Sequence, residues 1–144
     1  DYRQRQMGND PSEYRGWLLE VAEKSWVQFE GKFLELWRAH DAKTETPFMG
    51  KDLDGNSAEA FRTAFMKRVF ADTIGFAACK MMRRIVGLAK VADIADIDNA
   101  EERARAEENA LKMGREMILN RDKFASSSEL VDLATSISPV GGSN

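Results

Sequence analysis

Apolar residues along this chain recur at steps of three and four positions, the spacing that places them on one face of an α-helix. The pattern predicts helices over 10–40, 56–70 and 72–87, a long charged helix that opens at Asn99, and a short helix over 126–137. No segment alternates with the period of two that a half-buried strand shows, and there is no internal repeat. The sequence therefore predicts an all-α protein.

The first predicted helix carries a broad aromatic stripe. Asp10 is a good N-cap, Pro11 suits the first helical position, and Glu13 completes the start signal. The apolar positions that follow are Tyr14, Trp17, Leu18, Val21, Trp26, Phe29, Phe33 and Trp37. We interpret this stripe as core and not as a platform for stacking bases, because core packing is the usual role of such a stripe.

The middle of the chain contains a loop and one or two helices. Pro47, Gly50 and an Asp-Gly pair mark 41–55 as a loop, and Asn56 is a candidate cap for the helix that follows. Asp72 is a candidate cap for the next helix, which ends near Gly87. The sequence leaves open whether the chain breaks at Asp72 or continues as one helix.

The last third is predicted to hold two helices. Residues 91–98 form a short connection, and Asn99 caps the charged helix, in which Arg103 belongs to a solvated face. Ser126 with Glu129 forms a capping pair for the final helix.

Length and composition indicate one folded domain. A chain of 144 residues with 43% apolar residues and three tryptophans can bury a substantial core. No apolar run is long enough to cross a membrane, and the N-terminus lacks a signal region. The single cysteine, Cys79, excludes an internal disulfide and favours the cytosol. Its apolar surroundings predict a buried thiol.

The charge of the chain is unevenly distributed. The net charge is −3, but segment 60–91 holds seven basic residues and one acid, which gives +6 there and −9 elsewhere. An acidic body argues against a nucleic-acid partner, whereas a local basic segment favours a small anion site.

Three cations lie on the predicted helix that ends near Gly87. Lys80, Arg83 and Arg84 fall at i, i+3 and i+4, so they share one helical face and repel each other. One interpretation is an anion site, since paired guanidinium groups suit phosphate. The other is three surface side chains whose stems cover apolar neighbours. The spacing alone leaves both open.

Other catalytic and metal motifs fail on their spacing. The acids Asp52 and Asp54 begin like a calcium loop, but Gly55 comes too early and Thr63 stands where a glutamate is needed. His40 is the only histidine, which excludes sites that need several. No glycine-rich phosphate loop is present, so we expect no metal-binding or cofactor-binding residues in this chain.

The segment around the arginine pair resembles a known family. Residues 72–89, and within them Met82-Arg-Arg-Ile-Val-Gly87, are similar to the C-terminal lobe of S-methyl-5-thioribose kinases, the sugar kinases of methionine salvage. Weaker likenesses flank it over 14–19, 26–33 and 110–124. Together they cover most of the chain.

The resemblance implies a fold related to protein kinases and aminoglycoside phosphotransferases, of which this chain is the helical C-terminal portion. It implies transfer of the ATP γ-phosphoryl group, with magnesium, to the 1-hydroxyl of 5-methylthioribose by a cytoplasmic homodimer. An arginine pair of that family, which approaches the sugar and the transferred phosphate, matches Arg83 and Arg84. They are thus the expected catalytic and substrate-binding residues. No role is carried onto Lys80.

The family's glycine-rich loop, catalytic aspartate and metal-binding acids lie N-terminal to the matched region. We therefore expect 1–144 to be one helical domain from a longer kinase, with 1–10 and 138–144 as flexible ends. A start at Asp1 on a polar stretch agrees with this expectation. The alternative is a stand-alone helical module that binds an acidic partner through segment 60–91.

Overall fold

A computed structural model describes residues 2–43, 54–88 and 91–139. Every regular element in these ranges is a helix, which confirms the predicted all-α class for the described part of the chain. The helices are α1 (Tyr2–Gln6), α2 (Pro11–Lys43), α3 (Gly55–Val86), α4 (Ala92–Ala95), α5 (Ala100–Asn120) and α6 (Ser127–Ile137).

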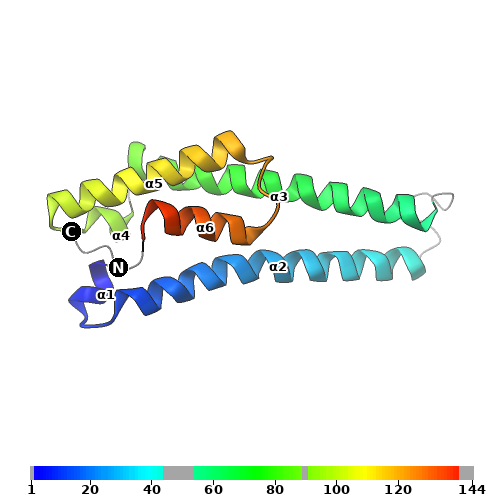
Figure 1. Cartoon of the computed structure of the whole chain (residues 1–144), viewed down its shortest axis with the longest axis horizontal. Coiled ribbons are helices and arrows are strands. Elements are labelled where there is room, and N and C mark those ends of the chain that lie inside the picture. Colours follow the sequence, from blue (N-terminus) through cyan, green and yellow to red (C-terminus); the bar gives the residue numbers. More distant parts are fainter. Residues whose placement is uncertain (1, 44–53, 89–90, 140–144) are drawn as a thin grey trace.

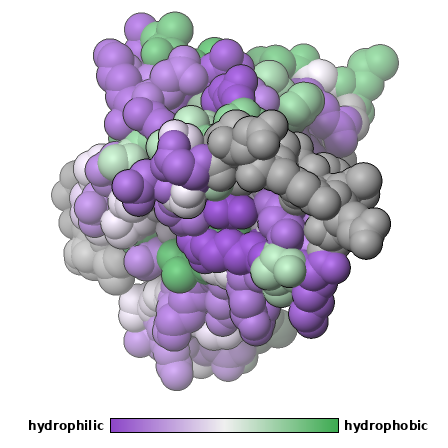
Figure 2. Space-filling view, turned by 90° about the vertical axis from the view of Figure 1, so that its right-hand side faces the viewer, coloured by the Kyte–Doolittle hydropathy of each residue, from purple (hydrophilic) through white to green (hydrophobic). Residues whose placement is uncertain are grey.

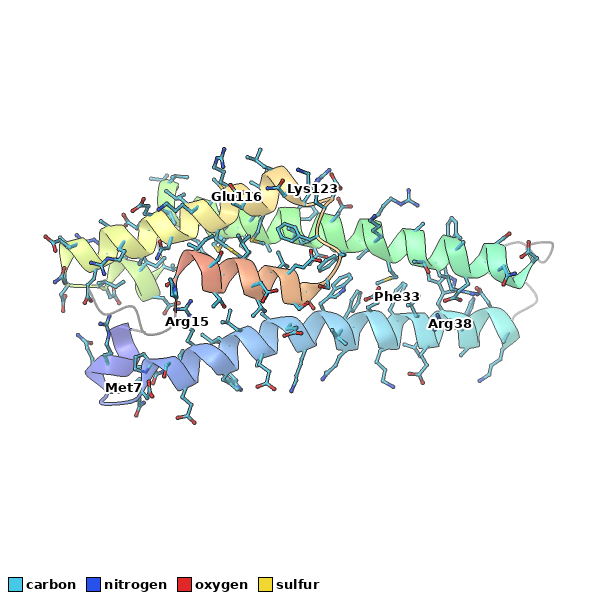
Figure 3. All side chains as sticks on the ribbon, viewed as in Figure 1. Met7, Arg15, Phe33, Arg38, Glu116 and Lys123 are labelled. Atoms are coloured by element: carbon cyan, nitrogen blue, oxygen red, sulfur yellow. The ribbon has the colours of Figure 1, made fainter. Side chains whose placement is uncertain are left out.

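Two long antiparallel helices, α2 and α3, form the frame of the molecule (Figure 1). Helix α5 lies along the C-terminal half of α3, and α6 packs between α5 and α2. Arg15 of α2 reaches the end of α6, where its guanidinium donates hydrogen bonds to the carbonyl and hydroxyl oxygens of Ser138 (Figure 3). Helices α5 and α6 therefore cover only part of the α2–α3 frame.

Helix α2 begins as predicted and ends slightly later. The Asp10 carboxylate accepts a hydrogen bond from the backbone N–H of Ser12 at 2.8 Å. The helix continues to Lys43, so the predicted loop loses its first residues, and 44–53 lie outside the described residues. The polar stretch expected to be a flexible N-terminal end contains α1, which packs on α2.

Helix α3 starts at a different cap and does not break. Asp54, not Asn56, is the N-cap: its carboxylate accepts hydrogen bonds from the backbone N–H groups of Asn56 and Ser57 at 2.9 and 3.0 Å. The prediction of Asn56 was wrong because Asp54 provides an ionised acceptor two residues earlier. The helix passes through Asp72, which settles the point that the sequence left open, and its C-cap is Gly87, as predicted.

The predicted caps at the starts of α5 and α6 differ in their side-chain bonds. Asn99 is confirmed as the cap of α5, where its side-chain oxygen accepts from Glu101 and Glu102 N–H groups at 2.9 and 3.1 Å. Ser126 occupies the cap position of α6, but its side chain makes no capping bond. Glu129 instead accepts a hydrogen bond from the N–H of Ala125 at 3.0 Å.

The buried core lies where α3, α5 and α6 meet. Phe70, Ile74 and Ala78 of α3 pack with Met117 of α5. Six partly buried side chains pack around them: Trp26 of α2, Met81 of α3, Met113 of α5, Phe124 before α6, and Leu130 and Leu133 of α6.

The aromatic stripe of α2 is not a core in this chain. Helix α2 contains no buried residue, and Trp17 and Phe29 are 54% and 47% exposed. The prediction failed because α2 has neighbours along one side only (Figure 1). Trp26 is the part of the stripe that packs on the core.

Cys79 is exposed, which corrects the predicted buried thiol. Ala78 takes the fully buried position, and one residue further along a helix turns the side chain by about 100°. Within the described ranges, none of the helices has the length and apolar composition needed to span a membrane.

Candidate functional site

The predicted arginine pair lies in the last turn of α3. Arg83 and Arg84 are both exposed, and no described residue forms an ion pair with either. Cations in this position interact favourably with the negative end of the helix dipole, which offsets part of their mutual repulsion. Gly87 caps the helix three residues after Arg84, with its N–H donating to the carbonyl of Arg83 at 3.0 Å.

The structure separates the two arginines. Neighbouring residues on a helix point about 100° apart, so Arg83 and Arg84 face different surroundings. Arg84 lines a hollow of about 190 Å³ that we call the Arg84 hollow. Its other walls come from the end of α3, from α4 and from the start of α5: Ile85, Val91, Ile94, Ala95, Arg103 and Glu107. Neither Arg83 nor Lys80 is among the residues that line it.

Arg103 is the residue that sequence reasoning missed. The charge pattern predicts a solvated side chain there, yet Arg103 is half-buried, and its guanidinium donates to the carbonyl of Ile97 at 2.8 Å. A signal was present in the spacing, because Arg103 lies seven residues before Ala110 and therefore on the inward face of α5.

The Arg84 hollow combines charge with apolar walls. Arg84 and Arg103 bring two guanidinium groups from two helices, and Glu107 adds one carboxylate. Guanidinium groups bind phosphate or other oxyanions, and a carboxylate accepts hydrogen bonds from hydroxyl groups. The hollow is thus suited to a small polar molecule that carries both hydroxyl and anionic groups.

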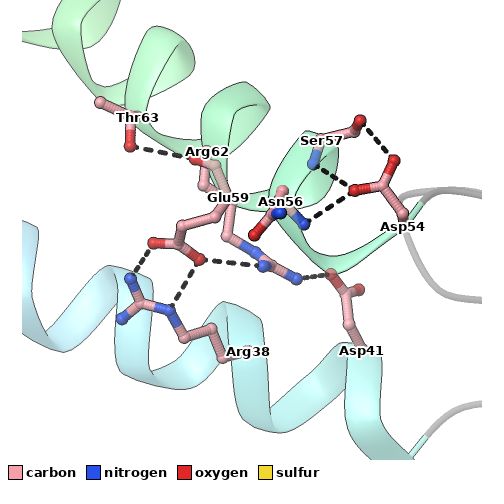
Figure 4. A network of polar contacts seen from close by, with 8 residues as sticks. All are labelled: Arg38, Asp41, Asp54, Asn56, Ser57, Glu59, Arg62 and Thr63. Carbon is pink, nitrogen blue, oxygen red and sulfur yellow. Dashed lines mark hydrogen bonds and ion pairs between the residues drawn. The ribbon is translucent and has the colours of Figure 1, made fainter.

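The basic segment does not form one continuous patch. Arg62 is held by the carboxylates of Asp41 and Glu59, at 2.9 and 3.2 Å, so its charge is already balanced (Figure 4). Arg68 and Arg84 are sixteen residues apart on one helix, which places them about 160° apart around its axis. Lys90 lies outside the described residues. This arrangement does not favour the alternative of a module that binds an acidic partner.

Acidic residues near the start of α3 are engaged in the fold. Asp52 of the calcium-like pattern lies outside the described residues, and Asp54 is the α3 cap. In the part of the chain that the structure describes, no three His, Cys, Asp or Glu residues are grouped as metal ligands.

Relatives of this chain are kinases of a small sugar. It is 35% identical over 126 residues to methylthioribose kinase 1 of Oryza sativa subsp. japonica, which is 85% of this chain and 29% of that protein. It is 34% identical over 123 residues to the methylthioribose kinase of a Geobacillus strain, covering 85% of this chain and 28% of the relative. The enzyme of Bacillus cereus matches at 35% over 114 residues. No model of a known protein family matches the chain.

The class of protein is therefore defined: this chain is homologous to a helical portion of kinases. More particularly, it is a homologue of the methylthioribose kinases, which confirms the resemblance inferred from the residues around Met82-Arg-Arg-Ile-Val-Gly87. The chain spans under a third of the length of the relatives it matches.

Proposed function

We propose that this chain is the helical C-terminal portion of a methylthioribose kinase, which transfers the γ-phosphoryl group of ATP to the 1-hydroxyl of 5-methylthioribose in methionine salvage. The observation that carries the proposal is the 35% identity with the rice enzyme. An alignment that covers 85% of this chain must include its middle, and Arg83 and Arg84 lie there.

Arg83 and Arg84 act on the substrate side of this reaction. Phosphoryl transfer depends on positioning and on stabilising the charge of the transferred group, and guanidinium groups provide both. The position of Arg84 in a hollow with Arg103 and Glu107 supports a substrate-binding role. Arg83, which is exposed beside it, approaches the transferred phosphate.

The nucleotide and magnesium bind to parts of the kinase that this chain does not contain. Phosphoryl transfer needs a phosphate cradle and metal-binding acids, and the sequence has no glycine-rich phosphate loop. The complete enzyme works in the cytoplasm as a homodimer, with a small sugar as its substrate and without a nucleic-acid or membrane partner. These properties are part of the proposal, and the likeness to methylthioribose kinases is what supports them.

ATP-dependent phosphorylation of methylthioribose by the complete gene product tests the proposal. Arg83→Ala and Arg84→Ala should each lower kcat/KM by about 10²–10³, the usual effect of losing one charge-stabilising donor. Arg68→Ala is the matched control, because it removes an exposed arginine from the same helix. Wild-type activity in the Arg83→Ala/Arg84→Ala double variant would refute the assignment of these residues.

A further inference from the structure

Half of the α2–α3 frame has no third helix over it. The Ser127 hydroxyl at the start of α6 donates to the carbonyl of Glu23 at 3.2 Å, and Arg121 at the end of α5 lies 3.9 Å from Asp72. Beyond these contacts, 27–43 of α2 and 55–69 of α3 run on as a pair, which we call the distal section (Figure 1).

Aromatic side chains of the distal section contact one another at the surface of the molecule. Trp37 meets Phe65 edge-on with 5.2 Å between ring centroids, and Phe33 stacks on Phe65 at 6.2 Å. An apolar groove of about 600 Å³ runs beside them, and it is lined by Phe33, Leu36, Trp37, His40, Phe61 and Phe65. Leu36 is 68% exposed and Phe61 is 45% exposed.

A second apolar face of α2 leads into this groove. Its members are spaced by 4, 3, 8 and 7 residues, so they share one side of the helix: Tyr14, Leu18, Val21, Phe29 and Leu36. We call this set the Val21 face, and all five side chains are exposed. Figure 3 shows α2 side chains directed both toward α3 and away from it.

The apolar surface follows the flank of the molecule and not its tip. Seen from the distal end, the described residues that face the viewer are mostly hydrophilic (Figure 2). Ser25 and the exposed Lys32 interrupt the Val21 face, so its apolar side chains are rimmed and divided by polar ones. Exposed apolar groups with polar surroundings are typical of an interaction surface.

We propose that the Val21 face and the distal groove are covered by the remainder of the same kinase polypeptide, through an apolar surface of that remainder. This inference rests on the proposed function. The rice relative is more than three times as long as its 126 matched residues, so most of its chain lies outside the match and must pack somewhere. A neighbour on the same polypeptide is always present, so it would keep this apolar surface away from water at all times.

Thiol labelling in the complete gene product tests this cover directly. Single cysteines replace Val21, Leu36 or Val27 in a Cys79→Ser background, because the native thiol is exposed. Val27 is the matched control: it is 57% exposed on the same helix, and it lies nine residues, or about 180° around the axis, from Leu36. Each variant is labelled under native conditions in the complete product and in the 144-residue chain.

We expect all three cysteines to react rapidly in the 144-residue chain. In the complete product, Val21→Cys and Leu36→Cys should react at least about tenfold more slowly, since a covered site must open before it reacts. Val27→Cys should react equally fast in both. Equal rates for Val21→Cys and Val27→Cys in the complete product would overturn the proposal.

Two further outcomes also decide against it. Protection that grows with protein concentration would identify a second copy as the cover, and a natural product no longer than this chain would remove the proposed cover. The labelling does not depend on catalysis. If Val21→Cys and Leu36→Cys are protected in a product without kinase activity, the proposed function fails and the intramolecular interface stands. Kinase activity without protection of these two cysteines would mean that the proposed function stands and that the intramolecular interface is wrong.

Discussion

Gly114 of α5 lies so close to Met82 of α3 that a methyl group on Gly114 would stand 2.5 Å from the Cγ atom of Met82. It would also lie 2.9 Å from the sulfur of Met82 and 3.6 Å from the carbonyl oxygen of Ala78. The close approach lets α5 pack directly on the part of α3 that precedes the arginine pair. It therefore helps to place Arg103 opposite Arg84.

Replacing Gly114 with alanine should destabilise the fold. The added methyl group must displace the Met82 side chain at its Cγ atom, and overpacking costs about 1–3 kcal/mol. Set against a helix-propensity gain of about 1 kcal/mol, the net loss of stability should reach about 2 kcal/mol. Gly31→Ala is the matched control, because its new methyl group would have no atom within 4 Å and only the propensity gain applies. Urea unfolding should show opposite signs for the two variants. Equal stabilisation of both would contradict the close approach.

The two caps that precede α5 and α6 should differ in strength. Asn99→Ala removes an acceptor for two backbone N–H groups and should lower the free energy of unfolding by about 1 kcal/mol. Ser126→Ala should have a smaller effect, because the serine side chain makes no capping bond. Denaturant midpoints of both variants test this, and a larger loss for Ser126→Ala would contradict it.

Most of the helices could be predicted from local signals in the sequence. Gly87 and Asn99 are visible in the sequence because helix ends need a residue that meets their unpaired backbone groups. Asp72 is ambiguous for the same reason, since an aspartate suits both a cap and an exposed helical position. The structure settles the matter: α3 runs through Asp72, whose exposed carboxylate lies 3.9 Å from the guanidinium of Arg121 on another segment.

The environment of the site could not be predicted in the same way. The helical period reveals that Trp17 and Cys79 have apolar neighbours, but not whether another element covers them. Arg103 shows the opposite case, in which a charged residue turns inward because its guanidinium finds a carbonyl partner. Both cases depend on contacts between segments distant in sequence.

Acid should weaken the start of α3. Hydrogen bonds from Ser57 lower the pKa of the Asp54 carboxyl below its usual value. A lowered pKa in the folded state means that the unfolded chain binds the proton more readily, so the contribution of Asp54 is complete above a pH of about 4. It is lost as the pH falls through the lowered pKa.

Asp54→Asn isolates this effect, because asparagine keeps the capping oxygen and removes the charge. The stability difference between wild type and Asp54→Asn, measured by urea unfolding, should be largest near pH 6 and shrink toward pH 3. A difference that stays constant across this range would show that the Asp54 charge makes no contribution.

The ion pair between Arg62 and Asp41 should contribute substantially to the free energy that holds α2 against α3. Its two side chains are each 11% exposed, the shortest nitrogen–oxygen distance is 2.9 Å, and the guanidinium lies 5.9 Å from the ring centre of Trp37. Arg62→Met or Asp41→Ala should each cost about 1.5–3 kcal/mol, the range for hydrogen bonds to charged groups. Each change removes this contact between largely buried groups, and Asp41→Ala leaves Arg62 its pair with Glu59 at 3.2 Å.

A double-mutant cycle measured by urea unfolding separates this pair from its surroundings. The Arg62→Met/Asp41→Ala variant should lose less stability than the sum of the single changes, because either single change already removes the contact between the two side chains. Lys24→Met, which breaks an exposed pair with Glu20, should change stability far less, since solvent screens that pair. Additive losses at Arg62 and Asp41 would mean that the contact does not tie the two helices together.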